Sequence, residues 1–252
     1  MASAIAQGLF AKGDFQIAVS DPHTLAMERW QTDFKAERFQ NQSVDAVIIA
    51  VKPQQFAEAA AALKVTLSPN TLVISVMAGI PTSKISATLN GHACVVRTMP
   101  NTPARIAQGI TALYATNACT AKQTELAQTI VASIGQTVWL QDESLIDAVT
   151  AVSGSGPSYV FYIAQALADA GAALGLPAET AKQLALATLQ GSAALALHTG
   201  EDLGALREQV TSKGGTTAAA LGVFRHAQLD ETLKAAVRAA HSRAQELASQ
   251  AT

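Results

Sequence analysis

Hydroxyl and glycine residues gather at one place in the C-terminal half of the chain, in the segment Ser212-Lys213-Gly214-Gly215-Thr216-Thr217. The two glycines predict a turn, and the alanine-rich residues that follow predict a helix beginning near Thr216. The first turn of a helix presents backbone N–H groups without partners and a positive potential, so it can hold a carboxylate. Ser212 and Thr217 add hydroxyl groups beside it. A helix cap alone would also explain one Thr and one Gly, so the segment by itself leaves a binding role and a structural role open.

A second glycine-rich segment, Ser153-Gly154-Ser155-Gly156-Pro157, lies in the middle of the chain. Pro157 fits the first position of a helix, where its fixed φ and missing N–H do no harm. The residues from Tyr159 to Ala170 are apolar on almost every side, which predicts a helix buried all round. Strands and helices alternate before this segment, and only helices are predicted after it. We therefore expect two domains, residues 1–146 and 147–252, although a glycine turn before a buried helix can also be purely structural.

The composition excludes several classes of protein. The chain has 252 residues, of which 49% are hydrophobic and 14% charged, and its net charge is −2. Near-neutral charge without a basic cluster argues against nucleic acid as the main partner. Two cysteines predict no disulfide framework and a reducing, cytoplasmic compartment. Neither a signal peptide nor an apolar run long enough to cross a bilayer is apparent, so we expect no membrane partner. No set of His, Cys and carboxylate residues has metal-ligand spacing, so we expect no metal site.

Alternating elements in the first domain predict an α/β fold with a buried parallel sheet. The continuous β-branched run Asp45–Val51 is typical of a strand covered on both faces. The expected strands are Gln16–Ser20, Asp45–Val51, Leu72–Val76, Cys94–Arg97, Ile110–Ala115 and Thr137–Leu140. The expected helices are Met1–Leu9, Leu25–Trp30, Gln55–Leu63, 83–89 (starting at Thr82 or Ser83) and Ala121–Ile134.

The start of the chain resembles the second half of a dinucleotide-binding βαβ unit. A helix comes first, and the strand that follows it ends in the carboxylate of Asp21. The strand and Gly-x-Gly turn that open such a unit do not precede the helix. We expect the first strand to be missing, which would leave Gln16–Ser20 and Asp45–Val51 each with an unpaired edge. A complete domain that begins with a helix is the alternative.

Ligands of such sheets bind beyond the carboxyl ends of the strands, so the residues there are the candidates for a nucleotide cofactor. Asp21 would bond a ribose 2′-hydroxyl and repel a 2′-phosphate, but Ser20 precedes it and leaves NADPH open. Lys52 follows a buried strand directly, where a cofactor role and a solvated lysine are both open. The expected cofactor-binding residues are Met1, Ser20, Asp21, Pro22, Val51, Lys52, Pro53, Ala78, Gly79, Pro100 and Asn101.

Four segments in this order and spacing resemble the pyrroline-5-carboxylate reductase family. They are Ala50–Gln54, Met99-Pro100-Asn101-Thr102-Pro103, Ala151–Tyr159 and Val210–Thr217. The first segment is shared with related dehydrogenases, whereas the last two together are specific. The chain departs from the family in lacking the strand and phosphate loop before Met1, and in having Lys213 where proline is common.

The resemblance implies NAD(P)H-dependent reduction of the ring C=N of pyrroline-5-carboxylate to L-proline, the last step of proline biosynthesis. It also implies a Rossmann-type cofactor domain and an all-helical domain that forms a homodimer, with dimers often assembled into rings. The substrate pocket of the family lies at the dimer interface beside the nicotinamide. Family grounds favour NADPH over NADH.

The resemblance also assigns roles to single residues. Thr217 would be the catalytic residue and bond the ring nitrogen, while Ser212 and the amides of Gly215, Thr216 and Thr217 would hold the carboxylate. Asn101 would lie near the nicotinamide. Glu143 stands where some relatives contact the substrate, although such a residue is more commonly a surface carboxylate.

Two other functions remain open from the residues alone. A dehydrogenase of a small hydroxy or keto acid would share the cofactor fold, but it usually needs a catalytic Lys or His in the helical domain, and none is persuasively placed. A truncated, non-catalytic relic would explain the absent phosphate loop. The leucine-rich segment Pro177–Leu197 predicts a dimer in either case, and Glu231–Ser249 predicts a final amphipathic helix.

Overall fold

The computed structural model describes residues 1–40, 42–63 and 67–250. The chain divides into two compact units, Met1–Ser155 with Ala240–Thr252, and Gly156–Ala239. The expected domain boundary at 146/147 falls inside helix α6 (Leu145–Val149). The last helix, α11 (Leu229–Gln250), contributes residues to both units.

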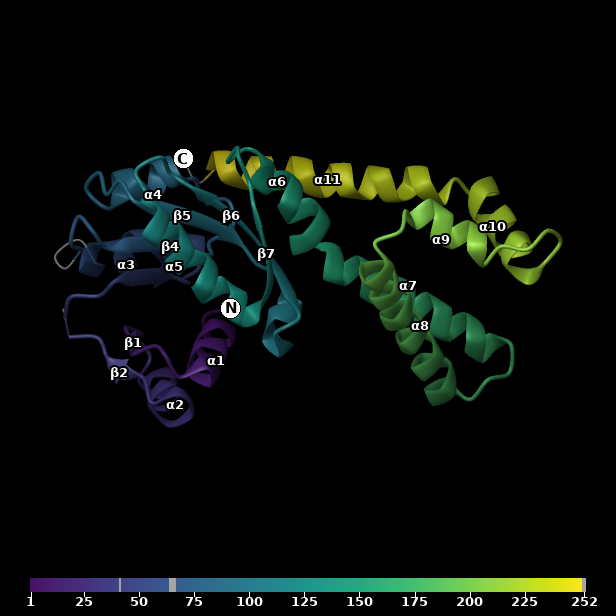
Figure 1. Ribbon diagram of the computed structural model, residues 1–252, viewed down its shortest axis with the longest axis horizontal. Coiled ribbons are helices and arrows are strands. Elements are labelled where there is room, and N and C mark those ends of the chain that lie inside the picture. The colour runs from purple at the N-terminus through teal and green to yellow at the C-terminus, as the bar shows by residue number, and fades with distance from the viewer. Residues whose placement is uncertain (41, 64–66, 251–252) are drawn as a thin grey trace. The chain divides into compact units, whose positions relative to one another are not determined.

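A five-stranded sheet forms the centre of the first unit (Figure 1). Its strands are β3 (Ala46–Ile49), β4 (Leu72–Ser75), β5 (Val95–Met99), β6 (Gly109–Ala115) and β7 (Gly135–Trp139), in that order. Strands β3, β4 and β5 run parallel, β6 is antiparallel to β5, and β7 is parallel to β6. The predicted α/β, Rossmann-type class is confirmed, and each of these strands was expected from the sequence to within a few residues.

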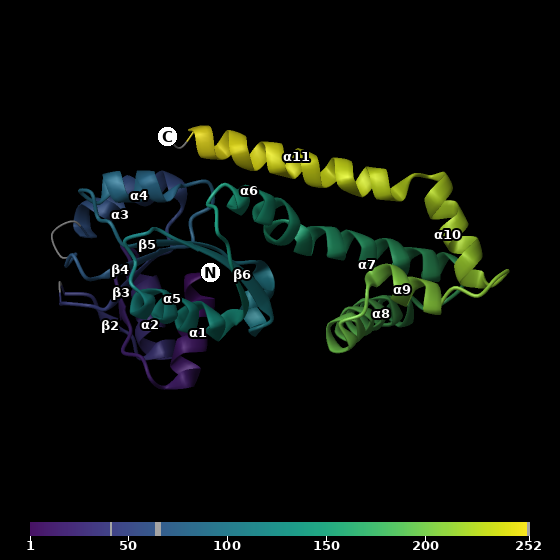
Figure 2. The same ribbon diagram turned by 45° about the horizontal axis from the view of Figure 1, so that its top comes forward.

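Helices cover both faces of this sheet, which explains why its central strands consist of apolar residues without alternation. On one face, α1 (Ala2–Lys12) and α5 (Ala121–Val131) pack against Leu72, Ile74 and Val96. On the other face, α3 (Phe56–Leu63) and α4 (Thr82–Thr88) pack against Val73 and Val95. Figure 2 shows α3 and α4 on one side of the strands and α1 and α5 on the other.

Short helical turns connect these elements. Helix α2 (Thr24–Phe34) follows the strand expected at Gln16–Ser20. The predicted helix Ala121–Ile134 divides into α5 and a 3₁₀ turn, Ala132–Ile134. Two further 3₁₀ turns, Pro53–Gln55 and Thr102–Ile106, follow β3 and β5. A π-helical turn, Thr150–Gly154, continues α6 towards the helical unit.

Two strands of the first unit stand apart from the main sheet. Strands β1 (Ala18–Val19) and β2 (Glu37–Arg38) pair in parallel with each other, and among the described residues neither pairs with β3. The unpaired edges predicted for β1 and β3 are therefore confirmed. Only Ile49 of β3 is buried, whereas all four residues of β4 are. Ala46 and Ile48 pack against the core on one face of the sheet, and Val47 packs against the core on the other. Strand β3 is therefore covered on both faces as expected, but less completely than β4.

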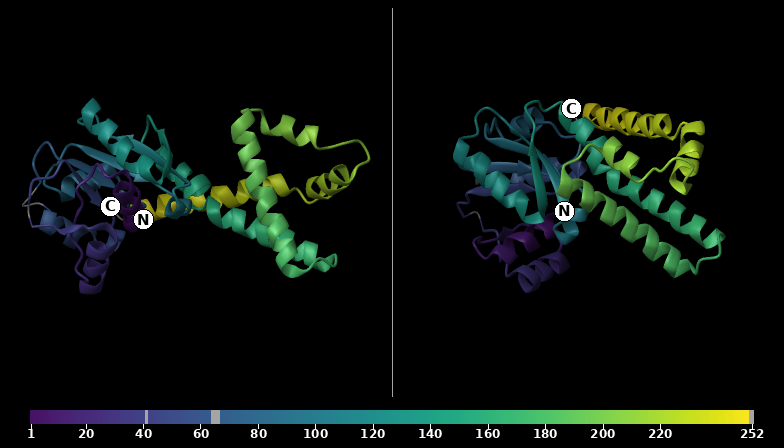
Figure 3. Two further views of the ribbon diagram at one scale, coloured as in Figure 1. Left: turned by 60° about the horizontal axis from the view of Figure 1, so that its bottom comes forward. Right: turned by 45° about the vertical axis from the view of Figure 1, so that its right-hand side comes forward.

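The second unit consists of helices: α7 (Gly156–Ala173), α8 (Ala178–Thr199), α9 (Leu203–Gln209), α10 (Thr216–His226) and the first part of α11. Helices α7 and α8 form an antiparallel pair (Figure 3). A Cβ at Gly171 would lie 3.2 Å from Cβ of Ala181, so the small residues of both helices allow a close approach.

Helix α7 is not buried on all sides within one chain, contrary to the sequence-based expectation. Ala164 is its one buried residue, while Phe161 and Tyr162 are 64% and 78% exposed. Leucines of α8, among them Leu195 and Leu197, are exposed as well. The exposed apolar side chains of α7 and α8 require a contact surface that one chain does not supply. No described helix combines the length and the hydropathy needed to cross a bilayer.

Candidate active site

Parallel strands bring the predicted cofactor residues of the main sheet to one edge. Strands β3, β4 and β5 point the same way, so the segments Val51–Pro53, Ala78–Gly79 and Pro100–Asn101 all follow carboxyl ends at that edge. Gly79 has φ +75°, a left-handed conformation that glycine adopts without strain. Ala78 beside it is exposed. The small side chains let backbone approach this turn closely, and the end of α11 does so: a Cβ at Gly79 would lie 3.5 Å from the backbone nitrogen of Ala248.

The neighbouring loops are held by their own hydrogen bonds. The carbonyl of Lys52 accepts the amide of Gln55 at 2.9 Å, and Pro53 opens the 3₁₀ turn. Oδ1 of Asn101 accepts the amide of Ile110 at 3.0 Å, which ties the end of β5 to the beginning of β6. The side chain of Lys52 is exposed, and Val51 is half-buried.

The remaining cofactor candidates belong to the first helix and the separate strand pair. Ser20, Asp21 and Pro22 follow β1, and Ser20 is exposed. Oδ1 of Asp21 accepts the amide of His23 at 2.9 Å, so this carboxylate is turned back into its own loop. Met1 caps α1 through its carbonyl, and α1 has no side-chain cap.

The predicted substrate residues Ser212, Gly215, Thr216 and Thr217 come together at the start of α10. Gly214 has φ +75°, and the amide of Gly215 donates to the carbonyl of Ser212 at 3.0 Å, which closes the turn. A Cβ at Gly215 would collide with Oγ of Ser212. Gly215 is the N-cap residue and no side chain caps the helix, so the first-turn amides have no partner within it. The arrangement suits a small carboxylate.

Glu143, the remaining substrate candidate, belongs to the other compact unit, and its carboxylate is already engaged. Oε1 accepts the backbone amide of Thr82 at 2.7 Å and Nη1 of Arg97 at 3.0 Å. Oε2 accepts the hydroxyl of Thr82 at 2.6 Å. Nη2 of Arg97 lies 3.8 Å from Oδ1 of Asp147. We call Thr82, Arg97, Glu143 and Asp147 the Glu143 cluster.

Arg97 was not singled out from the sequence as a functional residue. It lies in β5, directly after Val95 and Val96, and it is only 4% exposed. Its Nε has no hydrogen-bond partner. A charged residue inside a buried apolar strand requires a countercharge, and this is the signal by which the cluster could have been found.

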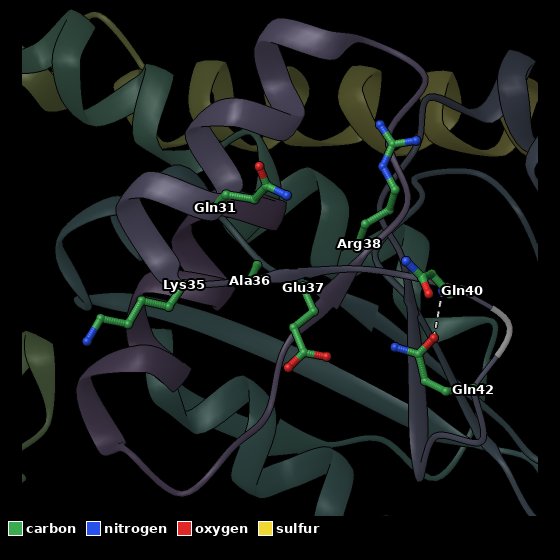
Figure 4. Close-up of a pocket in the computed structure, with 7 residues that line it drawn as sticks. All are labelled: Gln31, Lys35, Ala36, Glu37, Arg38, Gln40 and Gln42. Atoms are coloured by element: carbon green, nitrogen blue, oxygen red, sulfur yellow. Dashed lines mark hydrogen bonds between the residues drawn. The ribbon is translucent and has the colours of Figure 1, made fainter.

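One cavity has a wall to which none of these residues contributes. It has a volume of about 780 Å³ and is lined by Gln31, Lys35, Ala36, Glu37, Arg38, Gln40 and Gln42 (Figure 4). Figure 4 shows charged and amide side chains around it, and none of the predicted site residues contributes to its wall. Within the described part of the chain, no group of three or more His, Cys, Asp or Glu residues could hold a metal ion.

The fold and these loops define the class of the protein. A Rossmann-type sheet joined to a helical unit is the organisation of an NAD(P)H-dependent oxidoreductase. The family described as "NADP oxidoreductase coenzyme F420-dependent" matches residues 1–79. The family described as "Pyrroline-5-carboxylate reductase dimerisation" matches residues 143–247.

Relatives over nearly the whole chain identify the family. A pyrroline-5-carboxylate reductase of Pseudomonas aeruginosa is 40% identical, with 99% of this chain and 94% of the relative covered. The solved structure of such a reductase from Coxiella burnetii is 37% identical with a TM-score of 0.92, covering 98% of this chain and 94% of that one. A third reductase, from Streptococcus pyogenes, is 26% identical with a TM-score of 0.85, over 98% and 95% of the two chains. The chain belongs to the pyrroline-5-carboxylate reductase family.

Proposed function

We propose that this reductase converts 1-pyrroline-5-carboxylate to L-proline at the start of α10, with Thr217 as the residue that contacts the reacting nitrogen. The observation that carries the proposal is the helix start at Gly215, where no side chain caps the first-turn amides and the hydroxyl of Ser212 lies against Gly215. The substrate offers one carboxylate and one ring nitrogen to such a site. Ser212 and the amides of Gly215, Thr216 and Thr217 hold the carboxylate.

The reaction requires few catalytic contributions from side chains. NADPH supplies a hydride to the ring carbon of the C=N bond, and the π electrons of that bond move to the nitrogen. The protonated ring nitrogen donates a hydrogen bond to Oγ1 of Thr217, which fixes the plane of the ring. Because the protonated imine is already electrophilic, holding it in position provides much of the acceleration. This explains why the reaction requires neither a metal nor a catalytic histidine.

Two single substitutions test this assignment. Thr217→Ala removes the contact to the nitrogen, while Ser212→Ala removes one of several contacts to the carboxylate. Loss of a hydrogen bond to a charged group is worth roughly 1.5–3 kcal/mol, or about 10- to 150-fold in kcat/KM. We expect Thr217→Ala to lose turnover in this range and Ser212→Ala to lose much less. Equal and small effects of both would mean that the segment is only a helix cap.

NADPH is the preferred donor in this proposal. Asp21 is the one carboxylate at the end of β1, and it bonds the amide of His23 instead of standing free. The exposed hydroxyl of Ser20 is available to a 2′-phosphate. Comparison of kcat/KM for NADPH and NADH tests the preference, and a strong preference for NADH would contradict it.

The cellular compartment and the assembly of the enzyme are also proposals. We place it in the cytoplasm, because both cysteines are free thiols. We also propose that homodimers assemble further into a ring and that the substrate pocket lies at the dimer interface beside the nicotinamide. The molar mass in sedimentation equilibrium distinguishes a ring from a simple dimer.

A further inference from the structure

The N-terminus of α4 is capped by a residue far away in the sequence. Pro81 precedes the helix and offers no side-chain cap. Glu143, 61 residues further on, accepts both the amide and the hydroxyl of Thr82, the first residue of α4. Helices α4 and α6 both pack against β5, which brings the two residues together. Glu143 thus does for α4 what an N-cap residue normally does locally.

The loop that this contact fixes is the one predicted to carry the cofactor. The loop starts at β4, where the amide of Met77 donates to Oγ of Ser75 at 3.2 Å. Met77 and Ile80 are buried, while Ala78 is exposed at the tip. Strand β4 holds one end of the loop, and Glu143 holds the other through Thr82. The position of Ala78 and Gly79 therefore depends on Glu143, and Gly79 also lies against the backbone of Leu247 and Ala248.

Arg97 in turn fixes the carboxylate of Glu143. Its guanidinium is 5% exposed and lies 3.0 Å from Oε1, so the carboxylate has an ion-pair partner underneath it and Thr82 beside it. Both carboxylate oxygens are thereby used inside the protein. These bonds fix the orientation of the carboxylate, and Oε2, which accepts only the Thr82 hydroxyl, keeps a second acceptor site.

We propose that Glu143 is a positioning residue for the nicotinamide cofactor and not a ligand of the substrate. It acts through Thr82, by holding the loop Met77–Pro81 in the shape that receives the cofactor, and Arg97 keeps it in place. This rests on the proposed function in so far as that loop binds NADPH.

The test separates cofactor binding from substrate binding in the full chain. The dissociation constant of NADPH is measured by fluorescence titration, and KM for pyrroline-5-carboxylate at saturating NADPH. Glu143→Ala should weaken NADPH about 10-fold, the effect of losing a hydrogen bond to a charged group. Glu143→Gln should restore most of the affinity, because its amide oxygen still accepts the Thr82 amide. KM for the substrate should stay within about two-fold in both variants.

Two further variants keep the test decisive if Glu143→Ala folds poorly. Thr82→Val removes only the hydroxyl contact and should weaken NADPH binding in the same direction. Its effect should largely vanish in the background of Glu143→Ala or Glu143→Gln, because the two residues act as one unit. Glu125→Gln, the same chemical change at an exposed residue of α5, should leave both quantities unaltered.

Two other results would contradict the role proposed for Glu143. If Glu143→Gln raises KM for the substrate and leaves NADPH binding unchanged, Glu143 contacts the substrate and the proposal is wrong. If NADPH affinity is unaltered in Thr82→Val and Glu143→Gln is no better than Glu143→Ala, the loop is not positioned in this way. Failure of the unmodified protein to reduce the substrate would refute the proposed function, while the NADPH titrations would still decide the role of Glu143.

Discussion

Removal of Glu143 should cost far more stability than removal of an exposed ion-pair partner with better geometry. In Glu143→Ala, Arg97 keeps only Asp147, at 3.8 Å, as a countercharge, and its guanidinium is 5% exposed. Breaking a buried ion pair by removing one partner typically costs about 3–5 kcal/mol. Because Glu143 is itself 22% exposed and Asp147 compensates in part, we expect a loss near the lower end, about 3 kcal/mol.

The matched control is Glu246→Ala on α11. Arg243 and Glu246 approach to 2.6 Å, closer than Arg97 and Glu143, but each side chain is 58% exposed. Water screens such a pair, and its removal should cost less than about 1 kcal/mol. Distance alone would therefore give the wrong order of the two effects, and burial gives the right one.

Urea unfolding followed by circular dichroism measures both losses at one fixed protein concentration, because association contributes to the apparent stability. A second variant, Arg97→Met with Glu143→Met, replaces both charges by apolar groups of similar size and should recover much of the loss. If Glu143→Ala loses less than about 1 kcal/mol, Arg97 is not a desolvated charge that depends on Glu143.

Three other predictions concern the cysteines, the dimer and the sheet. Burial, together with the neighbouring thiol of Cys119, raises the pKa of Cys94 from 9.0 to about 12. Iodoacetamide at neutral pH should therefore label Cys119 and spare Cys94 until unfolding, as peptide mass spectrometry would show. Between about pH 9 and pH 12 the unfolded state loses this proton and the folded state keeps it. The stabilising contribution of the thiol is therefore complete below pH 9 and is lost as the pH rises to about 12. Cys94→Ala should remove this part of the pH dependence of thermal unfolding. Analytical ultracentrifugation at micromolar concentration should show a dimer, because α7 and α8 expose large apolar side chains; a monomer would contradict this. A chain extended at its N-terminus by a strand and a Gly-x-Gly turn should bind NADPH more tightly and unfold at a higher temperature, since the added strand can pair with β1 and β3. Equal affinity of the two chains would mean that the first unit has been misread.

The elements of the main sheet could be predicted because their signal is local. Leu72–Ile74 and Val95–Val96 are apolar runs, and such runs are typical of strands buried on both faces. Strand β2 was not expected, because Glu37 and Arg38 are exposed and polar. Strand β2 is defined by its pairing with β1, and a pairing between residues that are distant in the sequence leaves no local pattern.

The covering of α7 could not be derived from its sequence. An apolar helix can be buried by its own chain or by a second one, and the residues are the same in both cases. The structure of one chain leaves Phe161 and Tyr162 exposed, so the burial predicted by composition has to come from association. Glu143 shows the same limit, because its partners Thr82 and Arg97 lie 61 and 46 residues away.

The end of β5 shows how one register fixes several parts of the site together. Arg97 and Met99 point to the same face of the strand because side chains alternate. Arg97 holds Glu143, while Met99 packs on Gly154, where a Cβ would lie 2.5 Å from its Cε. Two residues further on, Asn101 binds the amide of Ile110. A shift of β5 by one residue would move Arg97 and Met99 to the opposite face and break the first two contacts at once. Gly154, which precedes the long helix α7, is therefore required for packing against Met99.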